Sequence, residues 1–124
     1  MVNHRIIDDL DADLSIDDVA ALRENLNEQR LFRQEQLHQL SAAATARADA
    51  FLDRQAASQI EVRVKLAASA RMVLDDVEAA LERMDQGRYG ACHLCRGTIA
   101  RERLMIVPQA RYCARCQQVK EAAR

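Results

Sequence analysis

The sequence predicts a mainly α-helical protein, in which a long antiparallel helical hairpin (coiled coil) is followed by a small four-cysteine module and a short C-terminal helix. Three observations lead to this prediction. The 124 residues are 49% hydrophobic yet include only three Gly, one Pro and no Trp, a composition that favours long helices over sandwiches and barrels. Apolar residues recur at helical spacing along two long segments. All four cysteines lie in the last third of the chain, as two pairs.

Charge is unevenly distributed along the chain, although the formal net charge is only −1. Residues 1–18 carry six Asp against one Arg, whereas residues 87–124 carry eight Lys and Arg against two Glu. We therefore divide the chain into an acidic N-terminal arm (1–14), a helical hairpin (15–87) and a basic C-terminal module (88–124). No apolar run approaches the roughly 20 residues that span a bilayer, and no secretory signal pattern is present, so we expect a cytoplasmic protein without membrane association.

The first helix is predicted for residues 16–46. Ser15 stands three residues before Asp18 and just ahead of an apolar series, which is a variant of the capping box that marks a helix start. Gln29 and Arg33 interrupt the apolar stripe of this helix. The stripe has spacings of three and four or their multiples, and its members are Val19, Leu22, Leu26, Leu37, Leu40 and Ala44.

The second helix is predicted for residues 55–86. Residues 60–66 alternate between apolar and polar side chains, which is the period of a strand. Helical spacing nevertheless persists over the whole segment, and an isolated strand of this length would lack a partner, so we interpret the segment as a helix. Its stripe comprises Ile60, Val64, Ala67, Arg71, Leu74, Val77 or Glu78, Leu81 and Met84.

The two stripes should face each other, because neither is sufficient to stabilise a helix of about 45 Å on its own. Two antiparallel helices satisfy this within one chain if the chain turns near residues 47–53. That segment contains no Gly or Pro, and the structural alternative is one helix over 16–86 that pairs with a second chain. We expect a monomer. Leu31, Val62 and Val73 are apolar and lie off the stripes, however, so contacts with a second copy of the chain stay open.

The cysteine pairs are the strongest chemical signal in the sequence. Cys92 and Cys95 form one Cys-x-x-Cys pair, and Cys113 and Cys116 form the second after a gap of seventeen residues. Four thiolates suit the tetrahedral preference of Zn²⁺, so we predict a zinc finger with one structural zinc and no open coordination position. Disulfides are disfavoured in a chain without an export signal, and a redox dithiol would need only one pair. His93 lies between two better-placed sulfurs and is not an expected ligand.

The metal is also expected to hold the C-terminal module together. Residues 88–124 contain few large apolar groups, and a core that small is marginal. Zinc binding worth on the order of 10 kcal/mol could stabilise it. Removal of the metal should therefore unfold the module and spare the helices.

Residues 81–120 resemble the zinc finger of the DksA/TraR family. The resemblance rests on the sequence YGACHLC at 89–95, the sequence CARC at 113–116 and the gap between them. The gap matches the family in its length and in the placement of Ile99, Arg103, Leu104, Pro108 and Ala110. The two predicted helices resemble the coiled-coil hairpin of the family in layout.

The resemblance implies a bacterial transcription factor that binds RNA polymerase rather than DNA. In this family the hairpin enters the secondary channel, acidic residues at its tip influence open-complex stability, and the zinc module packs on the channel rim. The candidate tip residues here are Asp49, Asp53 and Ala56, whose spacing departs from the family pattern of two Asp three apart and an Ala two further on. Either Asp could instead cap the second helix.

The resemblance also bears on guanosine tetraphosphate. Family members that respond to this alarmone have basic groups at positions that correspond here to Asp76, Val107 and Gln117. None of these side chains is cationic, and a tetraphosphate requires cations or helix N-termini. We therefore expect a weak or absent response.

The basic C-terminal module supports a second hypothesis, a zinc-finger nucleic-acid-binding protein that uses Arg96, Arg101, Arg103, Arg111 and Arg115. No recognition-helix signature accompanies these cations, aromatic residues for base stacking are few, and the acidic N-terminus would repel a duplex, so direct DNA binding is not favoured. A coiled-coil partner of another protein is a third hypothesis. The sequence contains no nucleophile and base pairing, phosphate loop or open metal site that predicts an enzyme.

Overall fold

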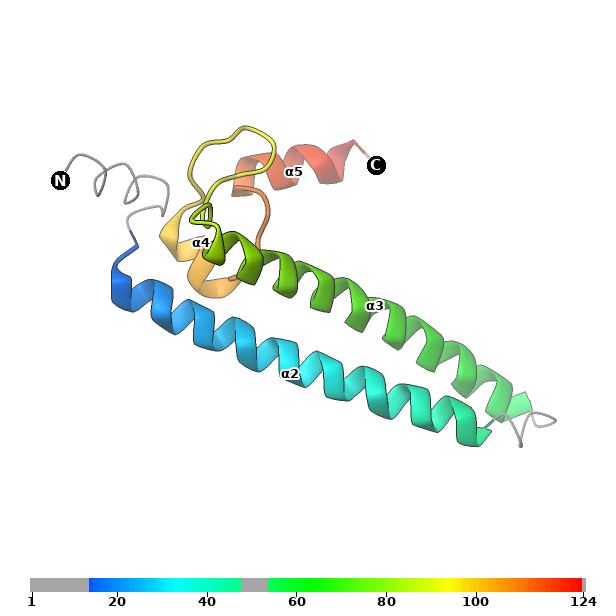
Figure 1. Cartoon of the computed structure of the whole chain (residues 1–124). Coiled ribbons are helices and arrows are strands. Elements are labelled where there is room, and N and C mark those ends of the chain that lie inside the picture. Colours follow the sequence, from blue (N-terminus) through cyan, green and yellow to red (C-terminus); the bar gives the residue numbers. More distant parts are fainter. Residues whose placement is uncertain (1–13, 48–53, 124) are drawn as a thin grey trace. The chain divides into compact units, whose positions relative to one another are not determined.

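The computed structural model describes residues 14–47 and 54–123. Within these residues the chain forms four helices, α2 (Ile16–Arg47), α3 (Arg54–Asp85), α4 (Arg101–Ile106) and α5 (Ala114–Ala122) (Figure 1). They contain no strand, only an isolated antiparallel bridge between Ala91 and Thr98. The mainly α class is thus confirmed, and the alternating segment 60–66 is helical. None of the described helices combines the length and apolar character that a membrane span requires.

The chain divides into two compact units, and α2 and α3 each contribute residues to both. The cysteine unit comprises Met1–Asn27 with Asp76–Arg124, and the hairpin unit comprises Glu28–Asp75. Within each unit, a stretch of α2 and a stretch of α3 lie side by side in opposite directions (Figure 1). The two helices are therefore separate antiparallel elements, and the alternative of one continuous helix is wrong. The residues between them, 48–53, where the turn was predicted, lie outside the described part of the chain.

The start of α2 is defined by a reciprocal capping box. The Ser15 amide donates to Asp18 Oδ2 at 3.1 Å, and the Asp18 amide donates to Ser15 Oγ at 3.0 Å. Arg101, on α4, donates from Nε and Nη2 to the two oxygens of the same carboxylate at 2.9 and 3.0 Å. The Arg101 hydrogen bond, followed by the bond from the Ser15 backbone, holds the pKa of Asp18 well below its usual range. One side chain therefore both caps α2 and ties it to α4.

The core of the cysteine unit is shared between the long helices and the C-terminal module. Leu26 and Val77 of the helices and Ile99 and Leu104 of the module are among its largest fully buried side chains. The buried apolar residues of this unit are Leu14, Leu22, Leu26, Val77, Ala80, Leu81, Met84, Tyr89, Cys92, Ile99, Leu104, Ala110 and Cys116. The module therefore adds its few apolar groups to a core that the helices have already begun, which relieves the small core expected from residues 88–124 alone.

The predicted stripe of α2 is confirmed wherever its side chains are described. Leu22 and Leu26 are buried, and Val19, Leu37 and Leu40 are half-buried, while the side chain of Ala44 lies outside the described set. The polar positions of the stripe also face inward, since Gln29 and Arg33 are half-buried. Arg33 Nη1 donates to Gln36 Oε1 at 2.9 Å. Leu31 and Phe32 of α2 and Val62 of α3, which lie off the stripes, are exposed. The structure contains one copy of the chain, so the dimer that the sequence left open stays untested.

The contact face of α3 differs from the predicted stripe. Val64 is 62% exposed and Arg71 is exposed, whereas Arg63 is half-buried and Ala70 is buried. The buried and half-buried positions include 60, 63, 67, 70, 74, 77, 81 and 84, which alternate steps of three and four as in a coiled coil. Positions 73, 76, 79, 80 and 83 are also buried or half-buried. The stripe was wrong by one residue at two turns. At the first, Val64 was predicted to face inward because it is more apolar than Arg63; at the second, Arg71 followed from the same spacing although Ala70 is the more apolar residue. The long aliphatic stem of an arginine can nevertheless cover a seam while its charge reaches solvent.

Candidate metal centre

The four cysteine sulfurs gather at one point of the cysteine unit. One sulfur from each of Cys92, Cys95, Cys113 and Cys116 lies within 4.8 Å of the other three, and Cys95 Sγ lies 3.9 Å from Cys113 Sγ. A tetrahedral zinc with Zn–S bonds of about 2.3 Å requires sulfurs about 3.8 Å apart. The four-cysteine donor set therefore fits one structural zinc ion. His93 is not part of the cluster, and its ring lies edge to face against Tyr112 with 6.1 Å between ring centroids.

A tight backbone turn presents the first cysteine pair. The Cys92 amide donates to the Gly97 carbonyl at 2.8 Å, and the Arg96 amide donates back to the Cys92 carbonyl at 3.0 Å. Amides of the turn also point at sulfur, since Leu94 N lies 3.4 Å from Cys92 Sγ and Gly97 N lies 3.4 Å from Cys95 Sγ. Such N–H···S contacts favour the thiolate form that binds metal.

A helix start presents the second pair. Cys113 is the N-cap of α5, and its sulfur accepts from the Cys116 amide at 3.5 Å. The first turn of α5 then carries Cys116 round to the same side as Cys113, because residues three apart share a helix face. The sequence Cys-x-x-Cys thus serves as a turn in the first pair and as a helix start in the second.

The thiols differ in how readily they lose their protons. For Cys92, burial raises the pKa, but hydrogen bonds from Cys95, Cys113 and Leu94 outweigh it and lower the pKa to about 6. For Cys116, burial and hydrogen bonds with the other three thiols raise the pKa to about 12. A divalent cation that takes the place of the thiol protons lets all four sulfurs act as thiolates, so zinc affinity should increase with pH.

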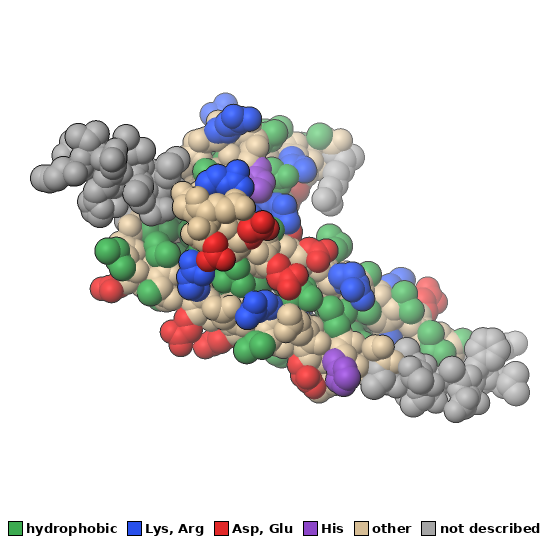
Figure 2. All heavy atoms as spheres, viewed as in Figure 1, with side chains coloured by type: hydrophobic (Ala, Val, Ile, Leu, Met, Phe, Trp, Pro, Cys, Tyr) green, Lys and Arg blue, Asp and Glu red, His purple; other side chains and the backbone are tan. Residues whose placement is uncertain are grey.

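Lys and Arg side chains gather over the cysteine unit on the face shown in Figure 2. Three of the five arginines predicted to form a basic surface nevertheless bond within the unit. Arg101 pairs with Asp18, Arg103 Nε donates to the Tyr112 carbonyl at 2.9 Å, and Arg111 donates to Asp76 at 2.9 Å. Arg96 and Arg115, the other two, are exposed. A nucleic acid would have to compete with these internal partners for most of the predicted surface.

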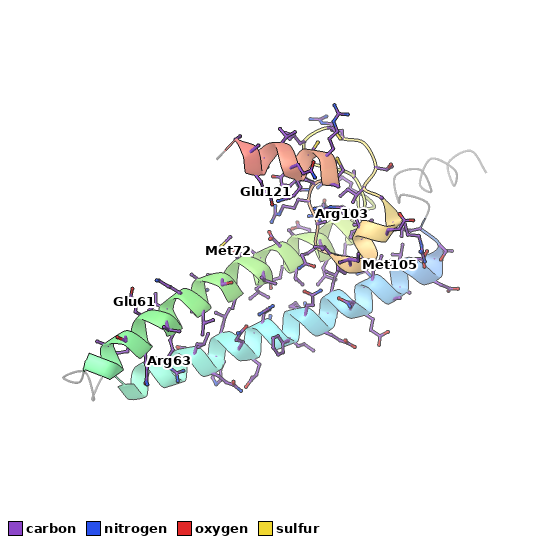
Figure 3. All side chains as sticks on the ribbon, turned by 180° about the vertical axis from the view of Figure 1, so that it is seen from behind. Glu61, Arg63, Met72, Arg103, Met105 and Glu121 are labelled. Carbon is purple, nitrogen blue, oxygen red and sulfur yellow. The ribbon has the colours of Figure 1, made fainter. Side chains whose placement is uncertain are left out.

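The three positions assigned to the alarmone line one hollow of about 510 Å³. The same lining includes the cations Arg103, Arg111 and Lys120, of which the sequence analysis placed Arg103 and Arg111 on a basic surface without connecting them to these three positions. Figure 3 labels Arg103 on α4 and Glu121 on α5, which both line this hollow. Lys120 follows Gln117 by one turn of α5, and that helical spacing was the signal available in the sequence.

The cations of this hollow already have partners. Arg111 Nε and Nη2 each lie 2.9 Å from Asp76 Oδ1. Lys120 Nζ donates to the Tyr112 hydroxyl at 3.0 Å and lies 4.8 Å from the centroid of that ring. The acids Asp76 and Glu121 further reduce the attraction of the hollow for a polyanion.

The predicted tip residues are not tested by the structure. Asp49 and Asp53 lie outside the described residues, and Ala56 belongs to α3 but its side chain is not described.

Comparisons with known proteins agree with this geometry. Residues 87–122 match the family model of the prokaryotic dksA/traR C4-type zinc finger. A 48-residue segment is 40% identical to an uncharacterized protein of Aquifex aeolicus (strain VF5), and it spans 39% of this chain but only 33% of that relative. The fold is similar to the structure of transcription factor DksA2 from Pseudomonas aeruginosa, with a TM-score of 0.72 and 22% identity over 84% of this chain and 83% of that one.

Proposed function

We propose that the chain is a transcription regulator, from the premise that residues 87–122 match the family model of the prokaryotic dksA/traR C4-type zinc finger. It binds RNA polymerase through the secondary channel and modulates initiation, with a weak or absent response to guanosine tetraphosphate. The observation that carries the proposal is a four-cysteine cluster joined to a pair of antiparallel helices, in a chain whose fold is similar to the structure of transcription factor DksA2.

The helix pair suits entry into a narrow channel. A single helix with its side chains is about 10–12 Å wide, so two helices side by side are roughly 20 Å across. The hairpin unit consists of such a pair, and its inward side chains include the small Ala67 and Ala70, which permit close approach. The described part of this unit adds no further element that would widen it.

The proposed active groups are the acids between the two helices. Asp49 and Asp53 lie in the segment that joins α2 to α3, and Ala56 follows in the first turn of α3. A carboxylate brought close to a metal-bound, phosphate-rich active centre would alter the local field there. Asp49 or Asp53 would then change transcription without being needed for polymerase binding.

The weak alarmone response rests on Asp76. This acid stands where responsive family members are basic, and it holds Arg111 in an ion pair. A tetraphosphate that entered the hollow would have to displace Asp76 from Arg111 and would also meet Glu121. We therefore expect purified polymerase with this protein to show little additional effect when the alarmone is added.

Binding to purified RNA polymerase core tests the proposal. The zinc-loaded chain should bind the core enzyme and compete with transcript-cleavage factors that use the same pore. Asp49→Ala and Asp53→Ala should each be assayed for binding and for transcription, with Asp75→Ala, an exposed acid of α3, as the matched control. Loss of the transcriptional effect with binding retained supports the tip role, and failure to bind or to compete would overturn the proposal.

A salt series separates this function from nucleic-acid binding. DNA binding weakens steeply as salt rises, because phosphate contacts release counterions. Polymerase binding that buries apolar side chains should persist. The nucleic-acid alternative has less support, since Arg101, Arg103 and Arg111 are held by internal partners.

A further inference from the structure

A cavity of about 710 Å³ lies beside the first cysteine pair and has no role in the proposed function. Its lining comes from the end of α3, from the loop after it and from the turn that contains Cys92. Three arginines, Arg83, Arg88 and Arg96, belong to the lining, and the acids in it number one, Glu82. We propose that this cavity binds the phosphate group of a small phosphate monoester.

Arg83 is the strongest indication of an anion site. Its side chain is only 7% exposed, and its Nη2 makes a long bond of 3.3 Å to the Ala110 carbonyl. The remaining nitrogens, Nε and Nη1, are buried and have no hydrogen-bond partner among the described residues. An arginine stays protonated in proteins, and a buried charge without a partner is costly. An oxyanion in the cavity would give Nε and Nη1 of Arg83 a hydrogen-bond acceptor of opposite charge.

Arg88 is held at the cavity by its neighbours. Arg88 Nη2 donates to Gln86 Oε1, and Gln86 Nε2 donates to Glu82 Oε1 at 3.3 Å. All three side chains line the cavity. Glu82 thus accepts from the Gln86 amide. The guanidinium of Arg88 is held by Gln86, which is neutral and therefore does not compensate its positive charge.

Arg96 occupies a backbone position that disfavours most side chains. Its φ is +64°, in the left-handed region, where glycine is tolerated most easily. The chain nevertheless carries an arginine at this turn, and its exposed side chain lines the cavity. Guanidinium groups bind phosphate oxygens with paired N–H donors, so arginines on different elements can hold one phosphate from several sides.

The charge and size of the cavity favour a phosphate monoester over a single carboxylate. Three arginines against Glu82 give these four side chains a formal charge of +2 before the adjoining zinc centre is counted, and a phosphate monoester carries about −1.5 to −2 near neutral pH. The volume lies within the range of about 300–1,000 Å³ typical of small-molecule sites, which leaves room for the group attached to the phosphate. Ala79 and Ala91 give this space small apolar walls.

The zinc centre offers a competing explanation for the arginines. Cys92 is part of the cavity wall, and zinc with four thiolates carries a net charge of −2, which could balance Arg83. Arg88 and Arg96 are exposed and would not need that compensation to be stable. Variants of these two residues therefore distinguish an anion site from a counter-charge for the metal.

Titration calorimetry on the zinc-loaded full chain, in buffer free of phosphate and sulfate, tests the proposal. Adenosine monophosphate and inorganic phosphate are the two probes, and adenosine monophosphate should bind more tightly because it also fills the apolar space. Arg88→Gln and Arg96→Gln should each weaken binding about tenfold, through the loss of charge-assisted hydrogen bonds. Arg115→Gln, an exposed arginine outside the cavity lining, should bind like the unaltered chain.

The zinc content of each variant and its loss of zinc to a chelator are measured alongside the titrations. Arg83 itself is not replaced, because its replacement could unfold the unit. The proposal is overturned if neither probe binds saturably, or if the Arg88 and Arg96 variants bind as well as the unaltered chain. It is also overturned if these variants lose zinc while the probes have no effect, since the arginines then serve the metal alone. None of these measurements uses RNA polymerase, so their result is independent of the proposed function.

Discussion

Replacement of Tyr89 by Phe removes one hydroxyl group from the core of the cysteine unit. Tyr89 is 2% exposed, and its hydroxyl donates to the Pro108 carbonyl at 2.8 Å, which ties the segment before the first cysteine pair to the segment before the second. The ring and its packing stay. The loss is one hydrogen bond, and the buried carbonyl loses a donor, so the free energy of unfolding should fall by about 1–3 kcal/mol. A loss of about 2 kcal/mol corresponds to a melting temperature lower by roughly 6–10 °C.

Tyr112→Phe is the matched control for this substitution. The Tyr112 hydroxyl accepts a hydrogen bond from Lys120 at an exposed position, so its removal should change the free energy of unfolding by less than about 0.5 kcal/mol. Urea denaturation of both zinc-saturated variants, followed by far-ultraviolet circular dichroism, measures the two changes. Equal shifts in the two variants would refute the assignment of the Tyr89 bond as a buried tie.

The same substitution has a signature at high pH. Burial raises the pKa of Tyr89 above its ordinary value of 10.0. Above about pH 10 the unfolded chain therefore loses this phenolic proton while the folded chain keeps it, and stability falls as pH rises, by up to about 1.4 kcal/mol per pH unit. Tyr89→Phe should lack this contribution, so the difference in stability between the two proteins should shrink between pH 10 and pH 12. A constant difference over that window would show that the phenol is not protected by folding.

Three further predictions concern the cap, the core and the metal. Asp18→Asn should accelerate amide exchange in the first turn of α2, whereas Asp17→Asn should not, because only Asp18 pairs with α4. Since folding lowers the pKa of Asp18 from its ordinary 3.8, its contribution is complete above about pH 4 and lost as pH falls further, so the two variants should converge in acid melts. Leu26→Ala, at a fully buried position, should cost about 3–5 kcal/mol in urea denaturation, while Leu31→Ala, 60% exposed, should cost less than about 0.5 kcal/mol. Chelation of zinc should abolish the near-ultraviolet signal and dispersed amide resonances of residues 87–122 yet leave most of the far-ultraviolet helical signal, and loss of both signals together would contradict separate unfolding.

Features set by local spacing were predicted well from the sequence. The capping box of Ser15 and Asp18 needs only four consecutive residues, and the cysteine pairs need only the pitch of a turn or helix. The length of the apolar periodicity identified α2 and α3 against the strand alternation of 60–66. In each case the physical cause lies within a few residues of its effect.

Features set by tertiary packing were predicted less well. The phase of α3 was missed at Val64 and Arg71, because packing against the neighbouring helix, and at residues 63 and 64 not apolar character, decides which positions face inward. The bond between Arg101 and Asp18 joins residues 83 positions apart, and no local pattern announces it. The ion pair between Asp76 and Arg111 was likewise not apparent from the sequence. The alarmone response was therefore predicted from Asp76, Val107 and Gln117 alone.

The contact between Asp18 and Arg101 has a consequence for biosynthesis. The cap of α2 needs only residues that leave the ribosome together, but the partner of its carboxylate is translated 83 residues later. At about 5–20 residues per second, this delay is roughly 4–17 s. A nascent chain can thus begin its first long helix early, yet that helix gains its anchor to α4 only after Arg101 has been translated.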